Sequence, residues 1–287
     1  PSFEFWNLND KLVYWVLMPA LLFHKMSLAP FDVELVLDYA AVILGGFFVA
    51  VAVGLGGARL AGYPGPVASS ILQGAARHNT FIALAVAERL YGVEGLAFAA
   101  LGAAMLIPTT NISVVTLMVA LVRRGEDTNV LRAILRDLAR NPLLIAVALG
   151  VAWNVGFDAA PAPVLHDVAR ILGGAALPIM LMCVGANLRV RAMAVAVGPT
   201  ALASVAKLIA FPLTVVLLAR AIGLGETETM VALLFGAAPT ASSAYTLARQ
   251  LGGDAPLMAA IVTMQTAIAF LTLPATIHLA DRLLFGG

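Results

Sequence analysis

The chain has 287 residues, of which 61% are hydrophobic and 11% are charged, and its formal net charge is +1. Soluble domains contain about 45–50% apolar and about 25% charged residues, so this composition excludes a soluble globular protein and predicts an all-α integral membrane protein. The single cysteine, Cys183, excludes an intrachain disulfide and a thiolate metal cluster.

Apolar stretches long enough to cross a bilayer recur along the whole chain. A membrane-spanning helix needs about 20 mostly apolar residues, and nine such stretches are separated by short segments rich in glycine, proline and charge. In chain order we expect spans at about 8–28, 33–61, 67–90, 95–122, 130–157, 163–188, 194–222, 227–250 and 254–283.

The basic residues set the expected orientation, because cytoplasmic loops carry an excess of lysine and arginine. Residues 123–141 are the richest segment, so we place this connecting segment inside. Alternating the spans outward from it puts ten basic residues inside and five outside. We therefore expect a multi-pass protein with its C-terminus outside. The composition, rich in Ala, Leu, Arg and Gly, suggests a bacterial inner membrane.

The two halves of the chain contain similar stretches in the same order. GAARHNT at 74–80 matches GAAPTAS at 236–242, LMPALLF at 17–23 resembles ALPIMLM at 176–182, and LIPTT at 106–110 resembles LTLPAT at 271–276. We therefore expect a first repeat at 1–122 and a second at 130–287. The second repeat has five spans and the first shows four, so we expect a first span to be missing before Pro1. Five spans per repeat invert one copy relative to the other, as in secondary transporters.

Polar residues interrupt the predicted spans 67–90 and 227–250 at matching positions. Pro239 removes a backbone donor and is followed by the hydroxyl residues Thr240, Ser242 and Ser243. The matching positions of the earlier span read Arg77, His78, Asn79 and Thr80. Irregular backbone at membrane depth is tolerated only where protein or a water-filled cavity surrounds it. Two broken helices that bind a solute are therefore expected.

Arg77 is the most informative of these residues. An arginine facing lipid at the bilayer centre costs about 2.5–3.5 kcal/mol or more, and few carboxylates occur at a matching depth in the sequence. Arginine forms bidentate contacts with carboxylates, so Arg77 suits a transiently bound organic anion. The i, i+4, i+7 spacing predicts that Gln73, Arg77 and Thr80 share one helix face.

Other polar residues within spans have two open interpretations each. His78 is either a proton carrier, since histidine titrates near neutrality, or a neutral hydrogen-bonding group, while Asn79 and Thr80 suit a carboxylate or carbonyl. Lys207 lies far from both ends of its span and either supports a carbonyl-rich break or takes part in coupling. Asn111 and Gln265 either join helices by hydrogen bonds or line the site.

Five stretches of the sequence together resemble the auxin efflux carrier family, which includes bacterial organic-acid carriers and plant PIN-type auxin carriers. They are LNDKLVYWVLMPALLF (8–23), QGAARHNTFIALAVAERLYG (73–92), NPLLIAVALG (141–150), LGGAALPIMLMCVGANL (172–188) and AAPTASSAYTLARQLGGD (237–254). In the plant carriers the first break reads Pro-Asn-Thr, and its Asn contacts the substrate carboxylate. Asn79 and Thr80 match that motif, whereas His78 stands in place of the proline.

The resemblance implies a ten-span inverted repeat with a scaffold domain, about 1–30 and 130–188, and a transport domain, about 33–122 and 194–287. It also implies a homodimer, elevator-like movement, and two broken helices that cross at the substrate site.

The sequence therefore favours a secondary active transporter or potential-driven carrier of a small organic anion: a mono- or dicarboxylate such as malonate, or an auxin-like aromatic carboxylate. Its expected partners are the anion and the lipid bilayer, not nucleic acid, with no cofactor and either H⁺ or Na⁺ as a coupling ion. The alternative is a sodium-coupled symporter of the bile-acid type. A non-transporting receptor would not explain the paired interruptions, and no nucleophile–base pair or metal set indicates an enzyme.

Overall fold

The computed structural model describes residues 3–29, 33–122, 130–186 and 196–286, and all regular structure in these ranges is helical. The elements are α1 (Phe3–Leu12), η1 (Val13–Leu17), α2 (Met18–Leu28), α3 (Val33–Leu60), α4 (Gly65–Ala76), α5 (Thr80–Val122), α6 (Val130–Ala139), α7 (Pro142–Gly156), α8 (Pro163–Ala186), α9 (Val197–Val205), η3 (Ala206–Ala210), α10 (Phe211–Ile222), α11 (Glu226–Ala237), α12 (Ser243–Leu251) and α13 (Ala255–Leu284).

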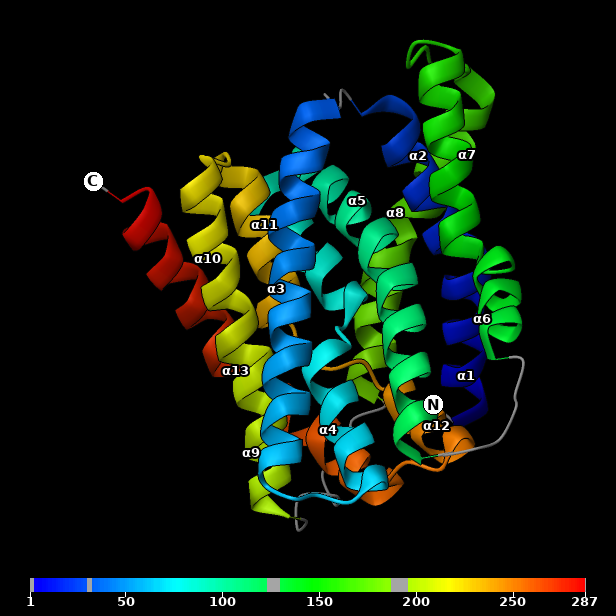
Figure 1. Ribbon diagram of the computed structural model, residues 1–287. Coiled ribbons are helices and arrows are strands. Elements are labelled where there is room, and N and C mark those ends of the chain that lie inside the picture. The colour runs from blue at the N-terminus through cyan, green and yellow to red at the C-terminus, as the bar shows by residue number, and fades with distance from the viewer. Residues whose placement is uncertain (1–2, 30–32, 123–129, 187–195, 287) are drawn as a thin grey trace.

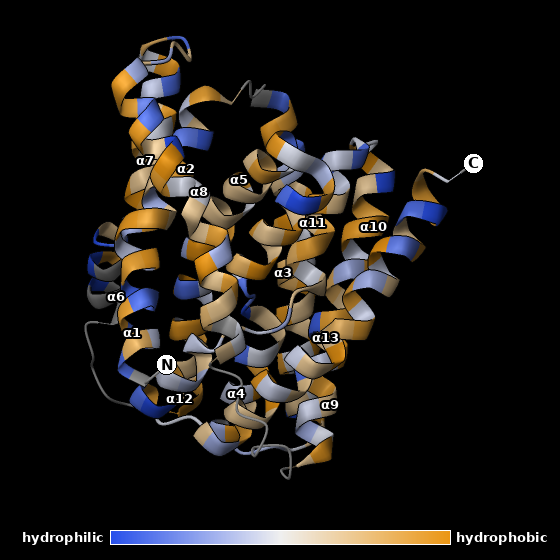
Figure 2. Cartoon of the chain, turned by 180° about the vertical axis from the view of Figure 1, so that it is seen from behind, coloured by the Kyte–Doolittle hydropathy of each residue, from blue (hydrophilic) through white to orange (hydrophobic). Residues whose placement is uncertain are grey.

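The helices have the length and polarity of membrane spans. Within the described ranges, five helical stretches are long and apolar enough to cross a bilayer. Hydrophobic residues dominate the middle of the long helices, and hydrophilic residues gather towards both ends of the bundle (Figure 2). The prediction of an all-α integral membrane protein is confirmed.

Residues 65–122 form two antiparallel arms, although their helical stretches follow one another almost without interruption. The first arm is broken at 77–79, between α4 and α5. The chain then reverses near Gly92, whose φ is +61°, and Gly95 lies against the backbone of Ala87. The second arm returns until Leu121 lies against Gly65, where α4 begins. The arms agree with the separate spans predicted at 67–90 and 95–122.

The second half contains the matching broken helix. Helix α11 ends at Ala237 and α12 begins at Ser243, with the irregular segment 238–242 between them. The turn that follows is tied to the first half, because the amide of Asp254 donates to the carbonyl of Pro66 at 3.1 Å. The Asp254 carboxylate then accepts from the Leu257 amide at 3.0 Å and caps α13.

The prediction of one span at 130–157 is wrong, because two helices meet at Asn141. Its Oδ1 accepts from the amides of Leu143 at 2.9 Å and Leu144 at 3.4 Å, and Pro142 occupies the first helical position. An Asn cap followed by proline starts a new helix. Only α7 is apolar, and α6 is amphipathic with arginines on it. Arg123, Arg124, Arg189 and Arg191, which contributed to the predicted orientation, lie outside the described residues.

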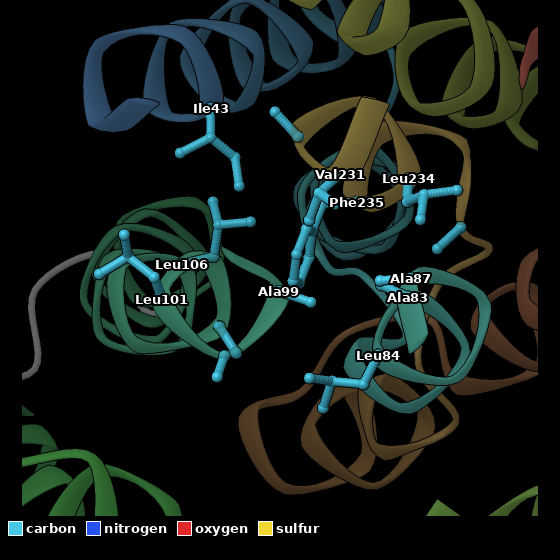
Figure 3. Packing of buried hydrophobic residues seen from close by; sticks show 14 of the residues in the cluster. Ile43, Ala83, Leu84, Ala87, Ala99, Leu101, Leu106, Val231, Leu234 and Phe235 are labelled. Carbon is cyan, nitrogen blue, oxygen red and sulfur yellow. The ribbon is translucent and has the colours of Figure 1, made fainter. Parts of the chain in front are cut away.

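The helices pack as two groups joined mainly through α5. Helices α1, α2, α7 and α8 pack on one another, whereas α3, α4, α9, α10, α11 and α13 form the second group. Figure 3 shows α11 packed against both arms of α5, with Phe235 pointing towards Ala99. The assignment of these groups to scaffold and transport parts stays a prediction.

Several helices of the two groups end at different levels along the bundle axis, although α3 of the second group reaches about as far as α2 (Figure 1). In Figures 1 and 2, α2 and α7 extend further than α10 and α11 towards one end. At the other end, α4 and α9 extend further than α1, which carries the first described residues. The last residues of α13 lie towards the end opposite to the start of α1.

We predict that Gly65→Ala lowers stability by about 1–3 kcal/mol, the usual cost of overpacking. A Cβ at Gly65 meets the backbone carbonyl of Leu121. A backbone atom cannot move aside as the end of a flexible side chain can. Gly56→Ala is the control, because a Cβ there meets nothing within 4 Å and alanine favours a helix interior. Thermal unfolding of both variants in detergent tests this: equal midpoints would contradict the close contact between the ends of the two arms.

Candidate functional site

The two broken helices meet at their interruptions. The amide of Asn79, in the first break, donates to the carbonyl of Pro239, in the second, at 2.8 Å. Neither group has a partner within its own helix at this point. One backbone hydrogen bond therefore joins positions 160 residues apart, and it places the predicted substrate-binding segments side by side.

Gln265 of α13 and Thr240 tie the breaks together more firmly. The Thr240 amide donates to Gln265 Oε1 at 3.0 Å, and Gln265 Nε2 donates to the carbonyl of Gly74 at 3.0 Å. The Thr240 hydroxyl lies 2.7 Å from Gln265 Oε1 and 2.9 Å from the Gly74 oxygen. These amide and carbonyl groups are ones that helix ends leave free. Of the two interpretations of Gln265, the structure shows the helix-joining one.

The first helix breaks without a proline. The backbone of Arg77 is extended, with ψ at 144°, and the side chain of Asn79 accepts from the Ile82 amide at 3.2 Å. An Asn side chain that caps the next helix stabilises the start of α5. The break next to His78 is therefore present. The expected shared face of Gln73, Arg77 and Thr80 is wrong, because α4 ends at Ala76 and helical spacing does not continue across the break.

Arg77 extends from the first break towards the second arm of α5. Its Nη2 donates to Oδ1 of Asn111 at 3.1 Å, while its Nη1 is buried without a hydrogen-bond partner. Among the described residues no carboxylate pairs with it. The side chain of Gln73, fully buried one turn earlier, has both polar atoms without a partner. The crossing thus has donor capacity that the described part of the chain does not use.

His78 and Lys207 both contact Phe235, the first at its ring and the second at its backbone carbonyl. The His78 ring is buried, packs edge-on against the Phe235 ring at 5.4 Å between centroids, and has no hydrogen-bond partner at Nδ1. Lys207 Nζ donates to the Phe235 carbonyl at 2.7 Å and lies 4.6 Å from the centre of the Phe211 ring. Lys207 is thus buried beside the second break and does not extend to a membrane surface.

A cavity of about 280 Å³ lies between the two helix groups beside the second break. Its lining combines aromatic, charged and hydroxyl side chains from α1, η1, α5, α8 and the break: Asp10, Lys11, Tyr14, Trp15, Phe81, Met180 and Ser242. Ser242 and Ser243 are exposed, whereas Pro239 and Thr240 are buried behind them. The sequence analysis identified Ser242 but not the residues of the facing wall, because no local pattern indicates which helix faces the break.

A second cavity, of about 460 Å³, lies near the opposite end of the bundle. It too is formed between the two helix groups, by α2 on one side and α3, α5 and α11 on the other. Its lining residues are His24, Lys25, Leu28, Ala29, Leu35, Val93, Glu94, Ala97, Phe98 and Glu228. None of the predicted site residues belongs to this set.

We predict that Gln265→Met destabilises the protein by about 2–4 kcal/mol. The change leaves the buried Thr240 amide without a partner, which costs about 1–3 kcal/mol. It also removes one of two donors to the Gly74 carbonyl, which keeps the Thr240 hydroxyl, and a lost hydrogen bond costs about 0.5–1.5 kcal/mol. Thr266→Val is the control, since the Thr266 hydroxyl donates only to its own helix, at the Val262 carbonyl. Chemical unfolding in detergent measures both. Similar losses for the two variants would show that Gln265 does not hold the crossing.

Comparison with known proteins is in keeping with this geometry. A family model described as membrane transport protein matches residues 108–277. The match includes Asn111, Lys207, the whole second break and Gln265, and it begins after the first break. No curated protein matches the chain. Since the family model covers more than half of the sequence, the chain belongs to the membrane transport protein family.

Proposed function

We propose that the chain carries a small organic anion across the membrane by alternating access, with the anion bound at the crossing of the two broken helices. The observation that carries the proposal is Arg77. It lies at the first break, the hydrogen bond of its side chain is to the neutral Asn111, and one of its terminal nitrogens is buried without a partner.

The charge balance around the crossing favours an anion as the cargo. Arg77 and Lys207 both lie beside the breaks, and neither forms an ion pair with a described carboxylate. Charges at this depth are costly unless they are paired. An arginine fork matches a carboxylate in two parallel hydrogen bonds, and the Asn79 side chain and the Thr80 hydroxyl lie directly beyond it in the chain.

The cavity beside Ser242 is the proposed entry to the site. Its volume is about 280 Å³, and an apolar cavity of about 150 Å³ holds benzene. A carboxylate of the size of malonate, lactate or benzoate therefore fits. Its polar lining consists of Asp10, Lys11 and Ser242, so one carboxylate stands beside the Lys11 cation, and the Tyr14, Trp15 and Phe81 rings supply apolar contacts.

Elevator-type movement accounts for the different levels at which helices of the two groups end. Helices α4 and α9 extend further than α1 towards the end where α1 begins (Figure 1), and the cavity that reaches the second break involves α1 and η1. Movement of this group along α2 and α8 towards the opposite end would bring the breaks closer to the second cavity. We propose this movement as the transport step, and the α1 end as the cytoplasmic one.

The driving force separates this proposal from a sodium-coupled symporter. The membrane potential contributes about 2.3 kcal/mol per charge per 100 mV, so an anion leaves an inside-negative cell without a coupling ion. Uptake of an anion needs a cation. We propose potential-driven or proton-linked transport, and we treat sodium-linked uptake as the alternative that flux measurements distinguish.

Flux of labelled malonate, lactate and benzoate in proteoliposomes tests the function. We expect at least one of these carboxylates to move faster than in protein-free vesicles, with a rate that changes with an imposed potential or pH gradient. A strict requirement for sodium would replace the proposal with the symporter. Absence of flux and of binding for all three would contradict the anion-carrier proposal.

We predict that Arg77→Gln weakens carboxylate binding by about 10–150-fold, because hydrogen bonds to charged groups contribute about 1.5–3 kcal/mol. Glutamine keeps a donor near Asn111 but removes the charge. Arg220→Gln is the control, since Arg220 is exposed at the end of α10. Binding measured by calorimetry in detergent gives the result. Equal affinity in the wild type and Arg77→Gln would exclude Arg77 from the anion site.

We also predict that Ser242→Trp reduces flux at least tenfold, because the indole fills the cavity at its contact with the second break. Leu213→Trp is the control: Leu213 is an exposed apolar residue of α10, and a tryptophan there faces the lipid. Initial rates in proteoliposomes at equal protein density measure both. Normal flux in Ser242→Trp would show that the substrate takes another route.

A further inference from the structure

The carbonyl of Phe235 lacks the partner that an α-helix normally provides. In a helix each carbonyl accepts from the amide four residues later, and for Phe235 that residue is Pro239, which has no amide proton. The ammonium group of Lys207 lies at this carbonyl, with Nζ 2.7 Å from the oxygen. A side chain from η3 thus occupies the place of a missing backbone donor in α11.

The first break also leaves a carbonyl to side-chain donors, because Gly74 accepts from Gln265 and Thr240. The two breaks differ, however, at the carbonyl that matches Phe235 in the internal repeat. The match of 74–80 with 236–242 pairs Gln73 with Phe235 and Arg77 with Pro239. In the first break the Gln73 carbonyl receives the Arg77 amide at 2.9 Å, as in any helix. The proline of the second break removes the equivalent bond. Lys207 therefore compensates for a difference between the two repeats.

The surroundings of Lys207 indicate that its ammonium group, and not only the volume of its side chain, has a role. Its side chain is fully buried (0% exposed), the Phe211 ring lies 4.6 Å from Nζ, and no ion-pair partner is found among the described residues. Burying an ammonium group costs several kcal/mol, whereas a methionine or leucine would fill the same volume without that cost. Its segment, η3, is a π-helical turn, a feature frequent at functional sites.

We propose that Lys207 is a positioning residue for the second break. Its ammonium donates the hydrogen bond that Pro239 cannot, and this holds the last turn of α11. The position of this turn sets where the Pro239 carbonyl accepts from the Asn79 amide and where the Thr240 amide donates to Gln265. The significance for transport rests on the proposed function, but the structural role does not.

This role makes Lys207 and Pro239 energetically dependent on each other. Lys207→Met keeps an apolar stem but leaves the Phe235 carbonyl without a donor in an apolar interior, so the end of α11 loosens. Pro239→Ala restores an amide at the position from which Phe235 normally accepts. In the Pro239→Ala background, the Phe235 carbonyl then no longer requires Lys207.

Thiol labelling at the break tests this dependence without any substrate. Ala238→Cys, at a position of the break that is 0% exposed, is introduced in a Cys183→Ala background, because Cys183 is the chain's only cysteine, and the rate of reaction with a small maleimide is measured in detergent. We expect Lys207→Met to raise the rate at least tenfold and to lower the apparent Tm by about 5 °C. In the Pro239→Ala background the same change should alter the rate by less than threefold. Arg220→Met, at the exposed end of α10, is the matched loss of a cation and should change neither readout.

Equal fold-changes in the two backgrounds, or no change in either, would overturn the proposal, because both outcomes mean that Lys207 and Pro239 act independently. If Lys207→Met alone fails to fold, a folded double variant supports the proposal and an unfolded one overturns it. Since labelling and Tm involve no carboxylate, a failure of the transport proposal leaves this result unaffected. A failure here likewise leaves the flux measurements intact.

Discussion

The structure depends on the requirement that every backbone polar group within hydrocarbon finds a partner inside the protein. A helix broken at mid-depth leaves free amides at one end and free carbonyls at the other. Here the two breaks meet, and the Asn79 amide satisfies the Pro239 carbonyl directly. The remaining groups need side chains from other spans, so Gln265 fixes α13 and Lys207 fixes the span of α9, η3 and α10 against the crossing.

The two breaks solve this problem differently. At the first break, α4 ends where the backbone of Arg77 becomes extended, and α5 begins at the Asn79 cap, without a proline. At the second break, Pro239 prevents α11 from continuing. The Phe235 carbonyl there accepts from Lys207, and the Thr240 amide donates to Gln265. As a result the first break directs Arg77 towards Asn111 and the second arm of α5. At the second break Lys207 of η3 is buried at the Phe235 carbonyl, and Ser242 lines the cavity.

The helical architecture was predictable because it depends on local signals. Apolar length gave the spans, and Pro239 with its polar neighbours marked the second break. Asn141-Pro142 is a strong start signal for a new helix and is present in the sequence, but apolar length alone does not separate α6 from α7. The first break carries a weaker sequence signal than the second, because a capping asparagine interrupts a helix less strongly than a proline does.

The details of the site were not predictable for a physical reason. Thr240 contacts Gly74 and Gln265 contacts Gly74 across more than 160 residues, and such contacts depend on how separate helices pack. The sequence left two interpretations of Lys207 because its depth was evident but its neighbour was not. The wall of the cavity formed by Asp10, Lys11, Tyr14 and Trp15 was missed because nothing local shows that α1 and η1 face the second break.

The placement of the cations also bears on the direction of movement. Arg77 and Lys207 both belong to the group proposed to move, so in their charged forms the empty group carries positive charge through the membrane field. An inside-negative potential favours the position nearer the cytoplasm, at about 2.3 kcal/mol per charge for each 100 mV crossed. The proposed cytoplasmic end is the one towards which α4 and α9 extend further than α1 (Figure 1). In this proposal a bound carboxylate would cancel one charge and weaken the bias, so the loaded group would move outward at a smaller cost in the membrane field than the empty group.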